Sequence, residues 1–316
     1  MERKIPLVAI VGPTASGKTA LSINLAKKIN GEIVSADSMQ IYKEMDIATA
    51  KPTKDEMQGV KHHLIDFVET DHKFSVAEYI KCAQNVISDI DSRGKRAILV
   101  GGTGLYYSSL IDNISFEEEK SNADIREKLI EESKQYGGEF MLEKLAKLDP
   151  DYANKLHSKD ITRIIRGIEI NILFGHTMCE HKELSRKNPS PYNPLCVGIT
   201  YRDRQKLYDR IDKRVDIMVE NGLVDEAQYF YKKLDSEKTA VQAIGYKELF
   251  PYLEGKITLD EAIDNLKKAT RNYAKRQLTW FRKDERINWF FADEISALEM
   301  CNEVCLLCEK RFESDM

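Results

Sequence analysis

The stretch at residues 12–19, GPTASGKT, has the spacing G-x-x-x-x-G-K-[ST], which is typical of loops that hold phosphate groups. Backbone N–H groups in such a loop form an anion-binding concavity, and the following helix adds the positive end of its dipole. Lys18 supplies a cation, and the hydroxyl of Thr19 is suited to hold Mg²⁺. We therefore expect eight residues to bind the phosphates of a ligand: Gly12, Pro13, Thr14, Ala15, Ser16, Gly17, Lys18 and Thr19.

Such a loop usually indicates ATP binding, but the acidic side chain that accompanies it in ATPases is missing. That acid ends an apolar strand, where it helps to hold the metal and to position water. Here the candidate strand AILV, residues 97–100, runs into GGTG, residues 101–104. The sequence therefore disfavours a hydrolytic motor and leaves open which phosphates the loop binds.

Asp37 is the acid best placed to act on the bound molecule. It follows a short apolar segment, and the carboxyl ends of adjacent parallel strands open onto the same crevice as the phosphate loop. A carboxylate at this point can serve as a general base or a metal ligand. The alternative is an Asp that only caps the next turn.

Strand and helix patterns alternate through the first part of the chain. A continuous apolar run at residues 5–12 predicts a buried strand, and residues 31–38 predict a second short strand that ends in polar residues. Residues 18–29 between them have helical periodicity. A helix is expected over residues 75–94, followed by a strand and a glycine turn over 96–107. This alternation predicts an α/β fold, with a parallel sheet flanked by helices as in P-loop NTPases.

The pattern becomes helical after residue 117, and a strand-like run returns only at LCVGITY, residues 195–201. We therefore expect a discontinuous core with a helical insertion domain. Residues 1–119 would form the first part of the core, 120–190 the insertion, and 191–316 a second, mostly helical part.

Composition restricts the class of protein. The 316 residues are 42% apolar and 32% charged with a net charge of −4, which argues against binding nucleic acid through bulk charge. No apolar run approaches the roughly 20 residues that cross a bilayer. Six scattered cysteines and a strand-like N-terminus favour reduced thiols and a cytoplasmic protein.

Two groups of potential metal ligands are better explained by packing. Cys301, Cys305 and Cys308 share one helical face, and the eight residues after them offer no fourth ligand for structural zinc. His62 and His63 are adjacent on an expected strand, so they point to opposite faces. We expect apolar packing for the cysteines and packing or hydrogen-bonded roles for the histidines.

A basic segment lies near the C-terminus. Seven of the seventeen residues over 267–283 are Lys or Arg, with Tyr273, Trp280 and Phe281 between them. Such a helix suits nucleic-acid phosphates and base stacking, although a charge run alone is also typical of a solvated face. The same two interpretations apply to Arg210 and Arg214, one helical turn apart.

Taken together, seven motifs resemble those of the tRNA dimethylallyltransferases (tRNA isopentenyltransferases). They are GPTASGKT, SADSMQIYKEMDIATAKP, HHLID, LVGGTGLY, DRIDKRVDIM, QAIGYKEL and ATRNYAKRQLTWFR, running from residue 8 to about 282. The resemblance implies transfer of a dimethylallyl group from its diphosphate to N6 of the adenosine at tRNA position 37, giving N6-isopentenyladenosine in tRNAs that read U-initial codons. In this chemistry the bound phosphates leave the donor, so no hydrolytic acid is needed.

The resemblance also implies roles for individual residues. Asp37 would be the general base at N6, while Lys18, Arg214 and Mg²⁺ held at Thr19 would stabilise the departing diphosphate. Thr14 would line the donor site, and Thr103 the channel in which the substrates meet. The expected tRNA-binding residues are Asp37, Ser38, Met39, Gln40, Thr103, Arg126, Arg163, Arg166, Arg271, Lys275 and Arg276.

Other functions remain compatible with parts of the sequence. A P-loop small-molecule or nucleotide kinase shares the loop and fold, a non-catalytic RNA-binding module shares the basic segment, and an enzyme that prenylates free adenine nucleotides shares the loop and the Asp. The helical insertion and the basic segment favour a bulky RNA acceptor. The expected partners are thus the anticodon loop of tRNA, dimethylallyl diphosphate and Mg²⁺, bound by a monomer with no membrane contact.

Overall fold

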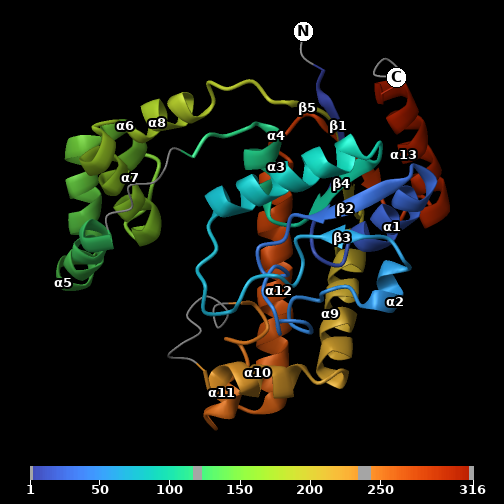
Figure 1. Cartoon of the computed structure of the whole chain (residues 1–316). Coiled ribbons are helices and arrows are strands. Elements are labelled where there is room, and N and C mark those ends of the chain that lie inside the picture. The colour runs from blue at the N-terminus through green and yellow to red at the C-terminus, as the bar shows by residue number, and fades with distance from the viewer. Residues whose placement is uncertain (1–2, 117–122, 234–242, 313–316) are drawn as a thin grey trace. The chain divides into compact units, whose positions relative to one another are not determined.

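A computed structural model describes residues 3–116, 123–233 and 243–312 of the chain. The chain forms two compact units, one made of Met1–Ile111 with Pro191–Met316 and the other of Asp112–Ser190 (Figure 1). The domain boundary expected between residues 119 and 120 lies outside the described residues.

The first unit contains a six-stranded parallel sheet. Its strands are β1 (Ile5–Val11), β2 (Gly31–Ser35), β3 (His62–His63), β4 (Arg96–Gly101), β5 (Tyr192–Thr200) and β6 (Ile287–Phe291). Their order is β3-β2-β4-β1-β5-β6, and every neighbouring pair is parallel. The predicted fold class, a parallel sheet of the P-loop NTPase-like kind flanked by helices, is confirmed. Because β1 lies inside the sheet, the phosphate loop that follows it emerges near the middle of the sheet's carboxyl edge.

Helices surround the sheet and extend below it in Figure 1. The helices of this unit are α1 (Lys18–Lys28), α2 (Lys54–Met57), α3 (Val76–Ser92), α4 (Gly104–Ile111), α9 (Arg204–Glu220), α10 (Leu223–Tyr231), α11 (Phe250–Leu253), α12 (Leu259–Phe281) and α13 (Ala297–Phe312). The start of α3 is fixed by a capping box, in which Ser75 and Glu78 satisfy each other's backbone N–H groups. The same motif, Thr258 with Glu261, begins α12.

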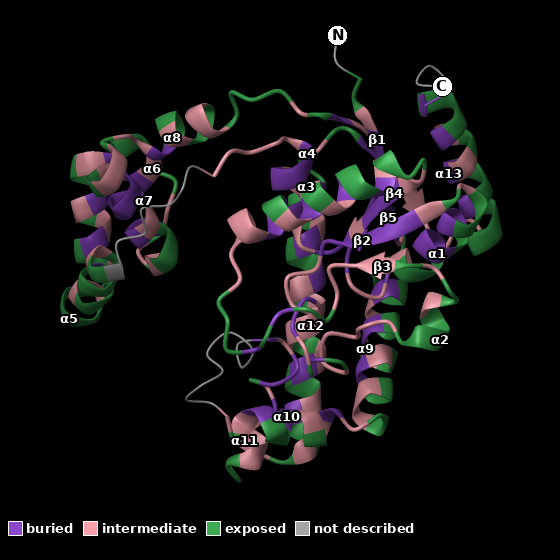
Figure 2. Cartoon of the chain, viewed as in Figure 1, coloured by how far each residue is buried: buried purple, intermediate pink, exposed green. Residues whose placement is uncertain are grey.

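The main core lies between the sheet and the pair α1 and α13, and the strands β1, β2, β4 and β5 are mostly buried (Figure 2). Cys301 and Cys308 on α13 belong to this core, at 1% and 5% exposure. No group of three or more potential metal ligands occurs within the described parts of the chain. The predicted apolar packing is confirmed for Cys301 and Cys308, and Cys305 packs against the same core.

The paired histidines make hydrogen bonds, as expected. A ring nitrogen of His62 lies 2.9 Å from the carbonyl oxygen of Val60, and Nε2 of His63 lies 2.7 Å from a carboxylate oxygen of Glu32. Glu32 is 3% exposed and also receives two hydrogen bonds from Arg93, which hold the pKa of its carboxyl far below the usual range. The two histidines therefore belong to the framework at the edge of the sheet.

The second unit is helical. It contains α5 (Ala123–Leu148), α6 (Pro150–Ala153), α7 (Ile161–Phe174) and α8 (Met178–Ser185), with an apolar core between α5 and α7. Its two ends are joined, because the backbone N–H of Ser115 donates to the carbonyl of Ser185 at 2.8 Å and the Asn113 amide donates to the carbonyl of Pro189 at 3.0 Å.

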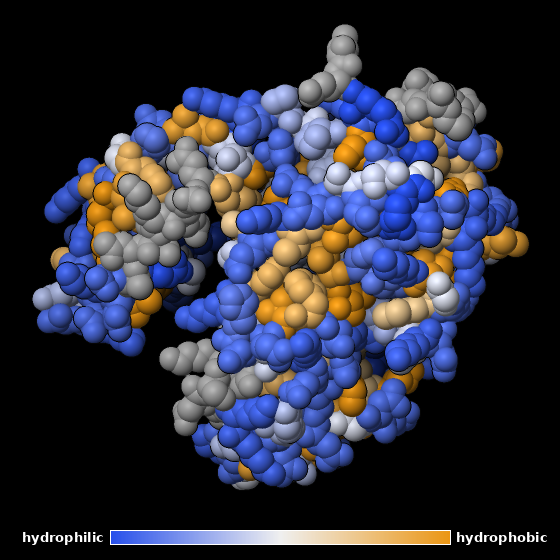
Figure 3. All heavy atoms as spheres, viewed as in Figure 1, coloured by the Kyte–Doolittle hydropathy of each residue, from blue (hydrophilic) through white to orange (hydrophobic). Residues whose placement is uncertain are grey.

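The surface in Figure 3 is mostly hydrophilic, with hydrophobic side chains gathered near the centre of the visible face of the first unit. In the described part of the chain, each helix is too short or too polar to span a bilayer.

Candidate active site

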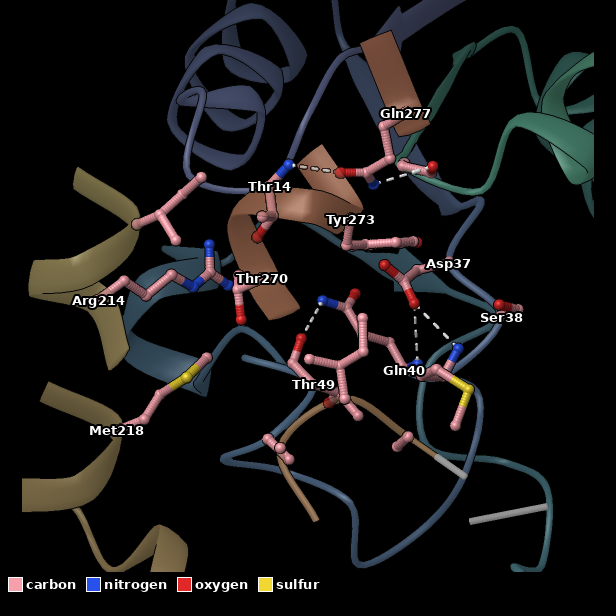
Figure 4. A pocket seen from close by; sticks show the side chains of 18 of the residues that line it. Thr14, Asp37, Ser38, Gln40, Thr49, Arg214, Met218, Thr270, Tyr273 and Gln277 are labelled. Atoms are coloured by element: carbon pink, nitrogen blue, oxygen red, sulfur yellow. Dashed lines mark hydrogen bonds between the residues drawn. The ribbon is translucent and has the colours of Figure 1, made fainter. Parts of the chain in front are cut away.

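A cavity of about 380 Å³ opens beyond the carboxyl ends of β2 and β4, between α9 and α12 (Figure 4). Its wall includes Thr14, Lys18 and Thr19 of the phosphate loop, Asp37 after β2, and Arg214 on α9. Parts of the chain that are distant in sequence thus supply one site with two half-buried cations and one carboxylate.

The phosphate loop has the backbone geometry that its glycines allow. Gly12 and Gly17 have φ angles of 147° and 103°, in the region that favours glycine. A Cβ at Gly12 would overlap the carbonyl oxygen of Ile199 on β5. The loop leads directly into α1 at Lys18, so the N-terminus of this helix faces the cavity.

Lys18 is held within the loop. Its Nζ donates to the carbonyls of Gly12 at 3.0 Å and Pro13 at 2.6 Å. Burial and, after it, the positive charge of Arg214 together lower the pKa of Lys18 to about 7, while the charge of Asp37 opposes the shift. Burial likewise lowers the pKa of Arg214. These two desolvated cations make the cavity receptive to a polyanion.

Arg210 and Arg214, both on α9, differ in position. Arg214 lines the cavity, as the resemblance implied for a diphosphate-binding residue. Arg210, one turn earlier, donates from Nε to the carbonyl of Ala15 at 3.1 Å and so supports the loop from outside. Of the two interpretations left open by the sequence, a solvated face fits Arg210, which is exposed, and does not fit Arg214, which lines the cavity.

Asp37 both caps a turn and faces the cavity. Its Oδ1 accepts hydrogen bonds from the backbone N–H groups of Met39 at 2.9 Å and Gln40 at 3.3 Å. Thr103 accepts a hydrogen bond from the backbone N–H of Ser38 at 3.0 Å, which ties the segment after β2 to the turn after β4. The four residues Asp37, Ser38, Met39 and Gln40 all line the cavity.

Gln277 on α12 connects the phosphate loop to the neighbouring turn. Its side chain is buried, with Oε1 accepting from the backbone N–H of Thr14 at 2.9 Å and Nε2 donating to the carbonyl of Gly102 at 3.0 Å (Figure 4). Sequence analysis did not identify this residue, because one Gln on a basic helix gives no signal of partners 263 and 175 residues away.

Glu226 on α10 was also missed. Its carboxylate accepts hydrogen bonds from the backbone N–H groups of Ile47 at 2.8 Å and Ala48 at 2.9 Å, and from the Tyr246 hydroxyl at 2.7 Å. The loop held in this way continues to Thr49, whose carbonyl accepts from Nε2 of Gln40 at 3.1 Å. Glu226 thereby supports one wall of the cavity without lining it.

The basic segment divides into two parts along α12. Near the middle of the helix, Arg271 pairs with Asp212 at 2.5 Å and Lys267 with Asp216 at 2.6 Å, so both cations are neutralised by α9. Further along, the exposed side chains have no carboxylate within 4.0 Å among the described residues. They are Lys275, Arg276, Arg282 and Lys283.

The three aromatic residues of this segment have different environments. Phe281 is fully buried against Tyr107, so it is unable to stack on RNA. Tyr273 lines the cavity, and burial together with the charge of Asp37 raises the pKa of its hydroxyl. Trp280 is 44% exposed.

The remaining candidate residues, Arg126, Arg163 and Arg166, lie in the second unit. Arg126 and Arg166 contact the buried carboxylate of Glu169 at 3.1 and 3.3 Å. Arg163 is exposed on α7. Two of the three arginines are therefore partly engaged in the framework of the unit.

The fold and site define the class of protein: an α/β P-loop protein whose phosphate loop shares a cavity with a carboxylate supplied by the adjacent strand. Residues 40–284 match the family model described as IPP transferase. The chain belongs to the IPP transferase family.

Individual proteins of this family are similar to the chain over most of its length. A tRNA dimethylallyltransferase from Thermoanaerobacter sp. (strain X514) is 50% identical over 93% of this chain and 94% of its own length, and one from Bacillus subtilis (strain 168) is 47% identical over 91% of each. The crystal structure of the full-length tRNA isopentenylpyrophosphate transferase from Bacillus halodurans has 44% identity and a TM-score of 0.73 over 99% of both chains. A eukaryotic dimethylallyltransferase acting on tRNA has 29% identity and a TM-score of 0.81, over 98% of this chain and 79% of its own.

Proposed function

We propose that this protein transfers the dimethylallyl group of dimethylallyl diphosphate to N6 of the adenosine at position 37 of tRNAs that read U-initial codons. The observation that carries the proposal is the shared cavity, which is lined by the half-buried cations Lys18 of the phosphate loop and Arg214 of α9 and by the carboxylate of Asp37. Family membership and the names of the relatives support tRNA as the acceptor.

The cations act on the leaving group. The loop amides, Lys18 and Arg214 bind the diphosphate of the donor and stabilise the negative charge that grows on it as the allylic C–O bond breaks. Because both cations are already desolvated, their interaction with a developing charge is stronger than it would be in water. Arg210 and Gln277 keep the loop in place while this happens.

Asp37 acts on the acceptor. Its Oδ1 is engaged by two backbone N–H groups, which fix the carboxylate while Oδ2 is left to receive a proton. As the N6–carbon bond forms, one N6 proton passes to Asp37 and the electron pair of the broken C–O bond leaves with the diphosphate. Loss of such a base typically slows a reaction by ~10²–10⁴-fold.

Thr19 is the residue that would hold Mg²⁺. It is exposed at the first turn of α1 and lines the cavity, whereas the described residues contain no cluster of acidic or histidine ligands. A single protein hydroxyl is compatible with Mg²⁺, because this ion usually takes most of its ligands from water and from the substrate's phosphate oxygens. When bound, the ion would add positive charge beside the diphosphate.

The acceptor would approach from the cavity mouth. Residues 38–40 line the cavity and would surround the target base, and Thr103 would support them through its hydrogen bond with Ser38. Lys275 and Arg276 would meet backbone phosphates. Arg163, Arg166 and Arg126 of the second unit would provide further RNA contacts. We further propose that the protein acts as a monomer in the cytoplasm.

The test uses purified protein, labelled dimethylallyl diphosphate and unmodified tRNA transcripts with Mg²⁺. We expect label at the adenosine in position 37, no transfer to AMP, and no transfer after chelation of Mg²⁺. Asp37→Asn should lower kcat by ~10²–10⁴-fold and leave diphosphate binding unchanged. ATP-dependent phosphorylation of a small molecule without RNA would instead support a kinase and refute the proposal.

A further inference from the structure

Trp280, in the last turn of α12, is a large apolar side chain left 44% exposed. It is nevertheless fixed in position, because it lies directly against Gly104 at the start of α4. A Cβ at Gly104 would lie 2.6 Å from the indole Nε1, so only glycine allows this contact. A rigidly placed, half-exposed indole suits recognition of a flat partner more than it suits packing.

The indole lies next to the active site. Arg276 and Gln277, one helical turn before Trp280, both line the cavity. On the other side, Gly104 follows Thr103, whose hydroxyl is bonded to Ser38 beside Asp37. Trp280 is thus close to the residues that would surround the reacting base without being one of them.

The charges around Trp280 indicate what the partner is. The exposed cations Lys275, Arg276, Arg282 and Lys283 flank it within one or two turns. None has a carboxylate within 4.0 Å among the residues that the structure describes, unlike Lys267 and Arg271 earlier on the helix. An aromatic ring among uncompensated cations is complementary to unpaired nucleic acid, which offers phosphates and π-faces together.

We propose that Trp280 stacks on a nucleobase adjacent to the target adenosine in the unpaired loop of the tRNA. When the adenosine leaves its stack to enter the cavity, its neighbour loses a stacking partner. The indole replaces that partner and holds the strand open at the cavity mouth. This inference rests on the proposed function for the identity of the RNA.

Intrinsic fluorescence tests the contact directly, because Trp280 and Trp289 are the two tryptophans of the chain. Trp289→Phe leaves Trp280 as the reporter, and Trp280→Phe leaves Trp289. We expect substrate tRNA to quench the emission of the first variant and to leave that of the second nearly unchanged. Absence of quenching in the Trp289→Phe variant, under conditions where it binds tRNA, overturns the inference.

Binding measurements supply the second readout. Trp280→Ala should weaken tRNA binding roughly 5- to 150-fold with diphosphate affinity and thermal midpoint unchanged, and Trp280→Phe should retain most of the affinity. Gly104→Ala, which displaces the indole, should also weaken tRNA binding. The matched control is Leu306→Ala, which removes an apolar side chain 55% exposed on α13 and should have no effect.

The outcomes separate the two proposals. If the wild-type protein modifies tRNA but Trp280→Ala binds tRNA equally well, or loses diphosphate binding to the same degree, the stacking role is refuted and the proposed function stands. If the wild-type protein modifies no RNA and tRNA quenches neither reporter, both proposals fall.

Discussion

Lys18 should take up a proton when a diphosphate binds. In the free protein, burial and the nearby Arg214 bring its pKa to about 7. A bound polyanion has the opposite effect and favours the charged ammonium. Since the protonated form is the one that binds, affinity should be constant at low pH and should fall as the pH rises through about 7.

The size of the effect follows from that pKa. A group with a pKa of about 7 is roughly 90% protonated at pH 6 and roughly 10% protonated at pH 8. The apparent association constant for diphosphate should therefore fall about tenfold between these pH values, equivalent to about 1.4 kcal/mol. At pH 7, Lys18 should contribute an uptake of about half a proton for each diphosphate bound.

Titration calorimetry in two buffers of different ionisation enthalpy measures this uptake. Inorganic diphosphate with Mg²⁺ is a suitable ligand, and Lys18→Arg is the matched control, because arginine stays charged throughout this pH range. Proton changes of the ligand itself are common to both proteins and cancel in the difference. Equal proton uptake and equal pH slopes in the two proteins would show that Lys18 is already fully charged in the free site, and the reasoning would be wrong.

Two further substitutions address residues that support the cavity. Gln277→Leu removes both hydrogen bonds of the bridging amide and leaves the Thr14 N–H and the Gly102 carbonyl without their partner, at a cost of about 1–3 kcal/mol per group. We therefore expect diphosphate binding to weaken at least 5-fold. An unchanged dissociation constant would contradict the bridging role. Glu226→Gln replaces a carboxylate that accepts several hydrogen bonds, so a loss of about 1.5–3 kcal/mol in unfolding free energy is expected in denaturant titrations. Because Glu226 also supports the loop that holds Gln40, kcat should fall more than diphosphate affinity, and a loss of stability with unaltered kcat would argue for a purely structural role.

The phosphate loop and the strands β1, β2, β4 and β5 were predictable because their signals are local, whereas β6 (Ile287–Phe291) was not predicted. The loop is defined by eight consecutive residues, and β1 and β4 are continuous apolar runs that end in glycine turns. The cysteines of α13 were predictable for the same reason, since their spacing places them on one helical face. Asp37 followed from the rule that neighbouring parallel strands end at one edge of the sheet.

The residues that assemble the cavity from a distance were not predictable. Gln277 and Glu226 act through backbone groups more than 170 residues away, and no spacing within the chain marks such pairs. The basic segment was located correctly, but the sequence did not indicate which of its cations pair with carboxylates. Only the packing of α12 against α9 reveals that Arg271 is paired while Arg276 has no acidic neighbour among the described residues.

Because the two ends of the second unit are joined, this unit could be deleted or exchanged as a whole. Since Ser115 and Ser185 are hydrogen-bonded within that unit, the polypeptide enters and leaves it at nearly the same point. A short glycine-rich linker from the end of α4 to the start of β5 could therefore replace the second unit, and strand pairing in the sheet would not change. The sheet with its phosphate loop would then be a self-contained donor-binding fragment, and the helical unit a cassette that can be exchanged between relatives to transfer properties that reside in it alone.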